Sequence, residues 1–181
     1  MPRKSSKPVP TTSAGRARAG RTSAFDAGLR MIVGRDHSVS ELRRKLIRRG
    51  YLEEEIDAAQ QRLMEHGFLG DKRFAERYAR RRSRSLGPLA ISAELAARGV
   101  DRDLVDAAIQ RLGPDTEILA AHKLADKLAG NTRYASYREL LHSVGAKLLR
   151  RGFSMDIARK ACDDLWRVMA EPSELDPFAP V

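Results

Sequence analysis

The 181-residue sequence predicts an all-helical protein, an elongated array, straight or curved, of three tandem three-helix units. Between about residues 24 and 170, apolar side chains recur at helical spacing, as in the stripe of Val39, Leu42 and Leu46. No stretch of this span alternates between apolar and polar residues for long enough to predict a strand. A similar nineteen-residue segment also occurs three times, which predicts a repeated helical unit.

Several helix ends can be located from their residue types. Ser38 and Glu41 have the spacing of a capping box, and Gly50 follows the last apolar position as a C′ glycine does. Pro88 and Pro114 each follow a glycine and are expected in the first turns of helices. These signals divide the span into short helices rather than a few long ones.

The repeated segment begins at residues 45, 94 and 147. Each copy contains Leu-x-x-Arg-Gly followed by an apolar residue, and a leucine stands thirteen residues after the glycine. The glycines, which lie about 50 residues apart, are Gly50, Gly99 and Gly152. The third helix of each unit is expected before the repeated segment, at 23–35, 71–85 and 115–130. Because one such unit has a thin core, stacking of successive units should bury additional apolar surface.

The chain is expected to divide into three units, which are 23–68, 69–113 and 114–170. Residues 1–22 carry six Lys or Arg residues and no acid, and they lack apolar periodicity, so a disordered basic tail is predicted. Residues 171–181 contain three prolines and three acids and are predicted as a frayed end. A monomer is expected, because an array of repeats needs no second chain to complete its core.

The charge of the chain favours a polyanionic partner. Lys and Arg number 34 against 24 Asp and Glu, which gives a formal net charge of +10. Nucleic acid, a nucleoprotein or an anionic membrane surface would suit this excess. Aromatic residues make up only 6 %, which argues against a base-stacking platform for single strands. The single cysteine, Cys162, excludes an internal disulfide, and the chain shows no signal peptide or membrane-spanning run, so the cytoplasm is expected.

Basic residues concentrate in three places, at 41–50, at 71–84 and at 147–151. A solvated helix face is the ordinary explanation of such a run. Seven cations within fourteen residues repel one another unless an anion offsets them, and this density favours an anion-facing surface. The predicted binding residues are Arg43, Arg44, Lys45, Arg48, Arg49, Lys72, Arg73, Arg77, Arg80, Arg81, Arg82, Arg84, Arg98, Lys147, Arg150 and Arg151.

The Leu-x-x-Arg-Gly element has two interpretations. The structural one is a leucine in the core, a cationic last turn that suits the helix dipole, and a C′ glycine. The functional one is a helical hairpin that grips phosphates through its turn. A sequence-specific helix-turn-helix is disfavoured, because acids such as Asp101 and Asp103 open the helix that would enter the major groove.

The sequence contains no recognisable catalytic site, and neither an enzyme nor a cofactor is expected. The four histidines are scattered without a partner at helical spacing, so no metal site is predicted. No Walker A loop or dinucleotide-binding glycine pattern is present. Cys162 lies on an apolar stripe with Ile157 and Leu165 and is expected in the core rather than as a nucleophile.

The stretch 67–75, Gly-Phe-Leu-Gly-Asp-Lys-Arg-Phe-Ala, resembles the signature region of the RecX family, bacterial regulators of the RecA recombinase. The resemblance continues through Tyr78, Gly87-Pro88 and Glu94-Leu95 to Arg98-Gly99-Val100, and it includes residues 35–46 before the stretch. It covers roughly 24–170 and is dense only from 36 to 112. Gly70 departs from the family, which usually has an aspartate there, and this leaves Asp71 as the expected N-cap of the helix.

The resemblance implies a rod of three-helix units that binds along the groove of the RecA–DNA filament. Such a protein would limit filament growth and reduce strand exchange, ATP hydrolysis and coprotease activity. RecA and single- or double-stranded DNA, bound without sequence specificity, are the expected partners. Two other classes remain open: an architectural DNA-binding protein that acts without RecA, and a helical enzyme that processes nucleic acid.

Overall fold

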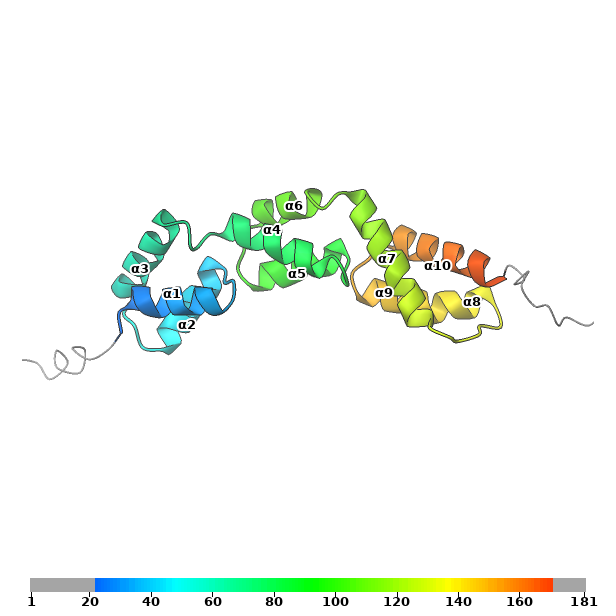
Figure 1. Cartoon of the computed structure of the whole chain (residues 1–181), viewed down its shortest axis with the longest axis horizontal. Helices are drawn as coiled ribbons and strands as arrows, with labels where there is room; N and C mark the ends of the chain where they lie inside the picture. Colours follow the sequence, from blue (N-terminus) through cyan, green and yellow to red (C-terminus); the bar gives the residue numbers. More distant parts are fainter. Residues whose placement is uncertain (1–21, 171–181) are drawn as a thin grey trace, which may run out of the picture.

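The computed structural model describes residues 22–170, in which all regular structure is helical and no strand is formed. The elements are α1 (Ala24–Gly34), α2 (Val39–Arg48), α3 (Glu53–Glu65), α4 (Asp71–Arg82), α5 (Pro88–Ala97), α6 (Arg102–Gln110), α7 (Pro114–Ala129), α8 (Tyr137–Leu140), the π-helical turn η2 (Leu141–Gly145), α9 (Ala146–Arg150) and α10 (Met155–Ala170). Figure 1 shows them in an elongated, curved rod. The predicted fold class is therefore confirmed. The expected basic tail and frayed acidic end lie outside the described residues, apart from residue 22.

Three separate hydrophobic cores follow one another along the rod. Each core joins three helical segments: α1 to α3, then α4 to α6, then α7 to α10 with α8, η2 and α9 forming one continuous segment. The main buried side chains are Leu42, Leu46, Ile56 and Leu63 in the first core, Phe74, Tyr78, Ile91 and Leu95 in the second, and Leu124, Leu140, Leu148 and Phe153 in the third. We refer to these groups as the first, second and third units; the exact borders at 68/69 and 113/114 stay predictions.

The predicted helix ends agree with the structure at most positions. The Ser38 hydroxyl accepts a hydrogen bond from the backbone N–H of Glu41 at 3.0 Å, and the Glu41 carboxylate accepts one from the N–H of Ser38 at 3.4 Å. Pro88 and Pro114 open α5 and α7. The repeat glycines have positive φ, 76° at Gly50 and Gly99 and 83° at Gly152, so the chain leaves each helix in the conformation that glycine favours.

The expected role of Asp71 as an N-cap is wrong. Gly70 is the N-cap of α4, and Asp71 is the first residue of the helix. The Asp71 carboxylate instead accepts a hydrogen bond from the backbone N–H of Val39 at 2.9 Å, and Val39 is the first residue of α2 in the preceding unit. Asp71 therefore satisfies an unpaired N–H of a different helix and holds two units together.

The joint between the first and second units uses the Arg-Gly turn after α5. The Ser38 hydroxyl donates a hydrogen bond to the backbone oxygen of Arg98 at 2.7 Å. Gly99 lies against the chain so closely that a Cβ atom there would overlap the side chain of Ser40. The N-terminus of α2 thus receives the Arg-Gly turn of the next unit.

The joint between the second and third units repeats this arrangement. The backbone N–H of Gly87 donates to the oxygen of Arg151 at 2.9 Å, and the N–H of Leu89 donates to the oxygen of Gly152 at 3.2 Å. Gly87 stands twelve residues before the glycine of its own unit, as Ser38 does in the first unit. The Leu-x-x-Arg-Gly element therefore does more than end a helix, because it also joins each later unit to the one before.

Candidate binding surface

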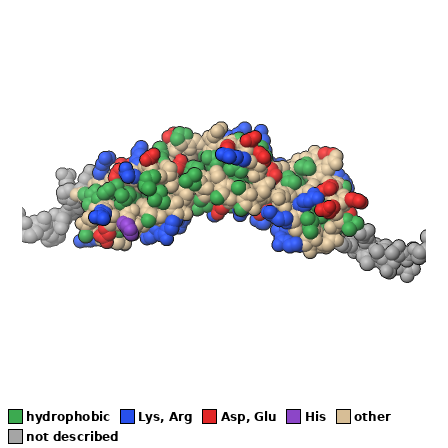
Figure 2. Space-filling model, turned by 180° about the vertical axis from the view of Figure 1, so that it is seen from behind, with side chains coloured by type: hydrophobic (Ala, Val, Ile, Leu, Met, Phe, Trp, Pro, Cys, Tyr) green, Lys and Arg blue, Asp and Glu red, His purple; other side chains and the backbone are tan. Residues whose placement is uncertain are grey.

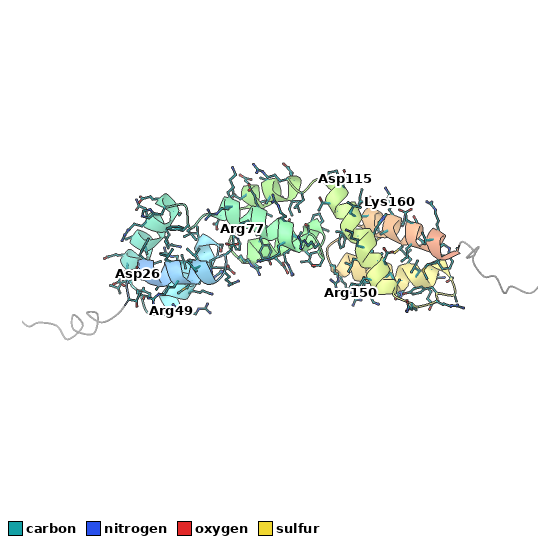
Figure 3. The ribbon with its side chains drawn as sticks, in the orientation of Figure 1. Asp26, Arg49, Arg77, Asp115, Arg150 and Lys160 are labelled. Atoms are coloured by element: carbon teal, nitrogen blue, oxygen red, sulfur yellow. The ribbon has the colours of Figure 1, made fainter. Side chains whose placement is uncertain are left out.

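Four of the predicted cations lie along one exposed side of α4. Arg73, Arg77 and Arg80 are spaced four and three residues apart, and Arg84 follows in the turn after the helix. This spacing sets them on the face opposite the buried Ala75 and Ala79. Arg77 contacts Asp36 of the first unit, with 3.2 Å between Nε and Oδ2, whereas Arg80 and Arg84 form no ion pair within residues 22–170 (Figure 3).

The other cations of α4 differ in the contacts that they make within the protein. Arg82 donates two hydrogen bonds to the Glu94 carboxylate, at 2.9 and 2.6 Å, and the Tyr78 hydroxyl donates a third at 2.5 Å. The hydrogen bonds from Arg82 lower the pKa of Glu94 and raise that of Arg82. Lys72 and Arg81 are exposed, and the Arg81 guanidinium lies 5.4 Å from the centre of the Tyr78 ring. Arg82 is thus directed at its own unit rather than at solvent.

Arg98 is held between the first two units. Its guanidinium lies 4.5 Å from the centre of the Tyr78 ring and donates to the backbone oxygen of Glu94 at 2.7 Å. Its Nε also lies 3.6 Å from a carboxylate oxygen of Glu41 in α2. These contacts engage the guanidinium on three sides and give it a structural role at the joint.

The cations of α2 are likewise divided. Arg43 forms ion pairs with Asp57 and Glu53 of α3. The Lys45 ammonium lies 2.7 Å from Nε2 of His37, and burial lowers the pKa of Lys45. Arg44 and Arg48 are exposed and form no ion pair among the described residues, and Arg49 is exposed at the C-cap.

Lys147, Arg150 and Arg151 form the basic end of α9. Arg150 is exposed, Lys147 is half-buried, and Arg151 donates weakly to the backbone oxygen of Ser85 across the joint, at 3.4 Å. Arg150 and Arg49 both lie on the lower edge of the rod in Figure 3. Figure 2, seen from behind, shows Lys and Arg side chains gathered along the concave lower edge on both sides of the middle unit.

A groove across the joint between the second and third units adds one cation that the sequence did not single out. It has a volume of about 390 Å³, and its lining includes Arg84 from the turn after α4 and Lys123 from α7. The exposed row of α4 therefore continues onto the third unit. The only feature of the sequence that pointed to Lys123 was its spacing of four residues from Lys127, which places both on one helix face.

The described residues offer no arrangement typical of catalysis. Within 22–170 no three His, Cys, Asp or Glu side chains come close enough to hold a metal ion. Cys162 is buried, as expected, and burial raises the pKa of its thiol to about 11, which opposes formation of the nucleophilic thiolate. None of the helices in this part of the chain is long and apolar enough to cross a membrane.

Comparison with known proteins assigns the two N-terminal units to a family. Residues 24–63 match the family model of the first three-helix domain of RecX, and residues 71–109 match that of the second. The chain belongs to the RecX family. The regulatory protein RecX of Trichlorobacter lovleyi is 35% identical over 138 residues, which cover 74% of this chain and 90% of that protein. The RecX protein of Chromohalobacter salexigens is 34% identical over 145 residues, which cover 78% and 91%.

Solved RecX structures share the fold. The crystal structure of RecX from Lactobacillus salivarius superposes with a TM-score of 0.71 at 25% identity, over 80% of this chain and 95% of that one. A second crystal structure of regulatory protein RecX gives a TM-score of 0.65 at 23% identity and supports the fold alone. The resemblance found in the sequence is confirmed, and this member of the RecX family has a regulatory role.

Proposed function

We propose that this protein binds along the groove of a RecA–DNA filament as a monomer and limits the growth of the filament. Strand exchange, ATP hydrolysis and coprotease activity would fall as a consequence. The observation that carries the proposal is the distribution of exposed cations over all three units of an elongated, curved rod. A rod of this kind can follow a helical groove and contact successive phosphates without reading bases.

The cations proposed to bind fall into two groups. Those that are exposed and form neither an ion pair nor a side-chain hydrogen bond among residues 22–170 are the strongest candidates, and they are Arg44, Arg48, Lys72, Arg80, Arg81, Arg84 and Arg150. Arg43, Lys45, Arg49, Arg73, Arg77, Lys147 and Arg151 would contribute to a lesser degree. Arg82 and Arg98 support the surface from within, because Arg82 is hydrogen-bonded to the Glu94 carboxylate and Arg98 donates to the backbone oxygen of Glu94. We add Lys123, which continues the row of Arg80 and Arg84 across the joint.

The test is ATP hydrolysis by RecA on single-stranded DNA, with this protein added below the RecA concentration. Inhibition at a substoichiometric ratio that extra DNA does not relieve supports a filament regulator. Inhibition that extra DNA relieves would instead support an architectural DNA-binding protein, the alternative favoured by the net charge of +10. Turnover of a nucleic-acid substrate by this protein itself would contradict both proposals.

A pair of variants connects this test to the surface. Arg80→Glu with Arg84→Glu reverses two unpaired cations, and we expect at least tenfold weaker inhibition and a shallower salt dependence, since each phosphate contact contributes about 0.7–0.9 to the slope. Lys160→Glu with Arg167→Glu makes the same change in net charge on α10, where Lys160 lies on the edge of the rod opposite Arg150 (Figure 3). Equal loss in both variants would mean that only total charge matters.

A further inference from the structure

The third unit has an apolar groove that the proposed function does not use. It is formed by α8, η2, α9 and the start of α10 and has a volume of about 300 Å³. Its apolar lining consists of Leu141, Gly145, Ala146, Leu149, Met155 and Ala158. Leu149 is 37% exposed and Met155 is 55% exposed. Large apolar side chains that are partly exposed and line a hollow are typical of a surface that binds a ligand or another polypeptide segment.

The equivalent surface of each of the other two units carries an ion pair, although Ile47 and Leu89, at the positions of Leu149 and His142, are also exposed there. In the first unit, Arg43 forms ion pairs with Glu53 and Asp57. In the second unit, Arg102 and Asp106 form one with 3.7 Å between Nε and Oδ2. Counted from the repeat glycine, the positions of Arg43, Glu53 and Asp57 are held in the third unit by Gly145, Met155 and Arg159. The third unit forms no such ion pair among the described residues, and an open groove lies at this position.

Two features of the groove point to a ligand rather than to an accidental gap. The π-helical turn Leu141–Gly145 forms part of its wall, and single π-helical turns within α-helices are frequent at functional sites. Its lining also includes Arg138, His142 and Arg159, none of which forms an ion pair within residues 22–170. An apolar floor with cations beside it suits a ligand that is both apolar and acidic.

The segment 171–181 of the same chain has this composition. It contains Leu175 and Phe178, together with three acids and no cation. It follows directly on α10, whose first residue, Met155, lines the groove. The sixteen residues of α10 span about 24 Å, and the eight residues from Ala170 to Phe178 can reach about 26 Å when extended.

We propose that segment 171–181 runs back along α10 and docks in the groove of the third unit. Phe178, which can reach the start of α10, contacts Leu149 and Met155, and the carboxylates lie beside Arg138 and Arg159. The segment thereby covers the one unit whose surface lacks the polar pair. This proposal is independent of RecA and of DNA.

The test uses the full chain with Phe178 replaced by the photo-crosslinking amino acid p-benzoylphenylalanine. After irradiation of a dilute solution, mass spectrometry identifies the attached peptide. We expect an intramolecular crosslink to Met155 or Leu149, in a yield that does not change with protein concentration. A crosslink between two chains would assign the groove to a second copy and overturn the proposal. Attachment elsewhere, or no attachment, would overturn it as well.

Matched substitutions separate docking from chance proximity. Leu149→Glu places a charge at the exposed rim of the groove, and we expect at least a fivefold loss of the crosslink. Leu119→Glu makes the same change at a 58% exposed site on α7 and should leave the yield unchanged. Arg138→Glu with Arg159→Glu should also reduce the yield. High salt should raise the yield of this variant and lower that of the unaltered chain, because salt screens repulsion in the first and attraction in the second. Circular dichroism of each variant confirms that the helices are retained.

Discussion

The backbone N–H of Gly87 donates a hydrogen bond to the carbonyl oxygen of Arg151 at 2.9 Å. Where the two backbones meet there is no room for a side chain on either glycine, Gly87 or Gly152. A Cβ atom on Gly87 would overlap the backbone of Gly152, and one on Gly152 would overlap that of Ala90. The second and third units are therefore joined by direct contact between backbones. Because the cores of the units are separate, the shape of the rod depends on such joints.

We predict that Gly152→Ala weakens this joint more than backbone strain alone explains. Gly152 has φ of 83°, where a non-glycine residue costs about 1–3 kcal/mol, and the added methyl group also meets the backbone of Ala90. Gly67→Ala is the matched control, since Gly67 has φ of 69° and nothing within 4 Å of an added Cβ. Urea denaturation should show a clearly larger loss in the free energy of unfolding for Gly152→Ala than for Gly67→Ala. Small-angle scattering should show a change in the overall dimensions of the Gly152→Ala rod. Equal losses would contradict a steric joint.

Ser38→Ala should cost more than the loss of a helix cap. Its hydroxyl accepts from Glu41 within the capping box and donates to the oxygen of Arg98 in the next unit. Losing a cap costs about 1 kcal/mol, and an unsatisfied buried carbonyl about 1–3 kcal/mol more. Ser136→Ala removes only the exposed cap of α8 and should lower the free energy of unfolding by about 1 kcal/mol. A loss for Ser38→Ala no greater than this would exclude its role in the joint.

The sequence predicted local structure well because the signals for it are local. The capping box at Ser38 and the proline at position 88 determine where α2 and α5 begin, and both were read correctly. The joints were not predicted, although they repeat. Ser38 and Gly87 occupy equivalent positions but bond to the next unit by a hydroxyl in one case and a backbone N–H in the other. Residue types alone do not reveal that a side-chain hydroxyl and a backbone N–H have the same role at the two joints.

The candidate surface shows a second limit of sequence reasoning. Arg80 and Arg82 belong to one run of cations, and nothing in the run distinguishes them. Only the packing of α5 against α4 brings Glu94 to Arg82 and leaves Arg80 in solvent. Lys123 was missed for a related reason, because its closeness to Arg84 depends on how α7 follows the second unit. The direction of a charged side chain is a property of the tertiary structure.

The stability of the first unit should decrease as the pH falls below neutrality. His37 is buried; its Nδ1 lies 2.8 Å from the oxygen of Arg35 and its Nε2 2.7 Å from Lys45, so a neutral ring donates to the first and accepts from the second. Burial lowers the pKa of His37 below 6.5, and the hydrogen bond to the backbone oxygen of Arg35 opposes this effect. The cations Lys45 and Arg35 lower the pKa further, against a smaller opposing effect of Glu41.

The folded state then binds fewer protons than the unfolded state at this site. The contribution of the neutral His37 ring to the free energy of unfolding is complete above pH 6.5 and is lost as the pH falls through the lowered pKa of His37. Urea denaturation between pH 7.5 and 5 should show this loss, and His37→Gln should reduce the pH dependence. His142→Gln, at an exposed position, is the control and should leave the dependence unchanged. If His37→Gln and His142→Gln both retain the full pH dependence of stability, groups other than His37 are responsible for that dependence.

Two arginines of α4, two residues apart, should have opposite consequences when neutralised. Arg82→Gln removes the charged donors from Glu94, and we expect a loss of about 1 kcal/mol in the free energy of unfolding, since the pair is partly exposed. Arg80→Gln breaks no ion pair, so its stability should stay within about 0.5 kcal/mol of the unaltered chain, while inhibition of RecA weakens. Thermal denaturation and the RecA ATPase assay, applied to both variants, measure the two effects. A stable Arg82→Gln with impaired inhibition, beside an Arg80→Gln with full inhibition, would reverse the assignment and make Arg82 the binding residue.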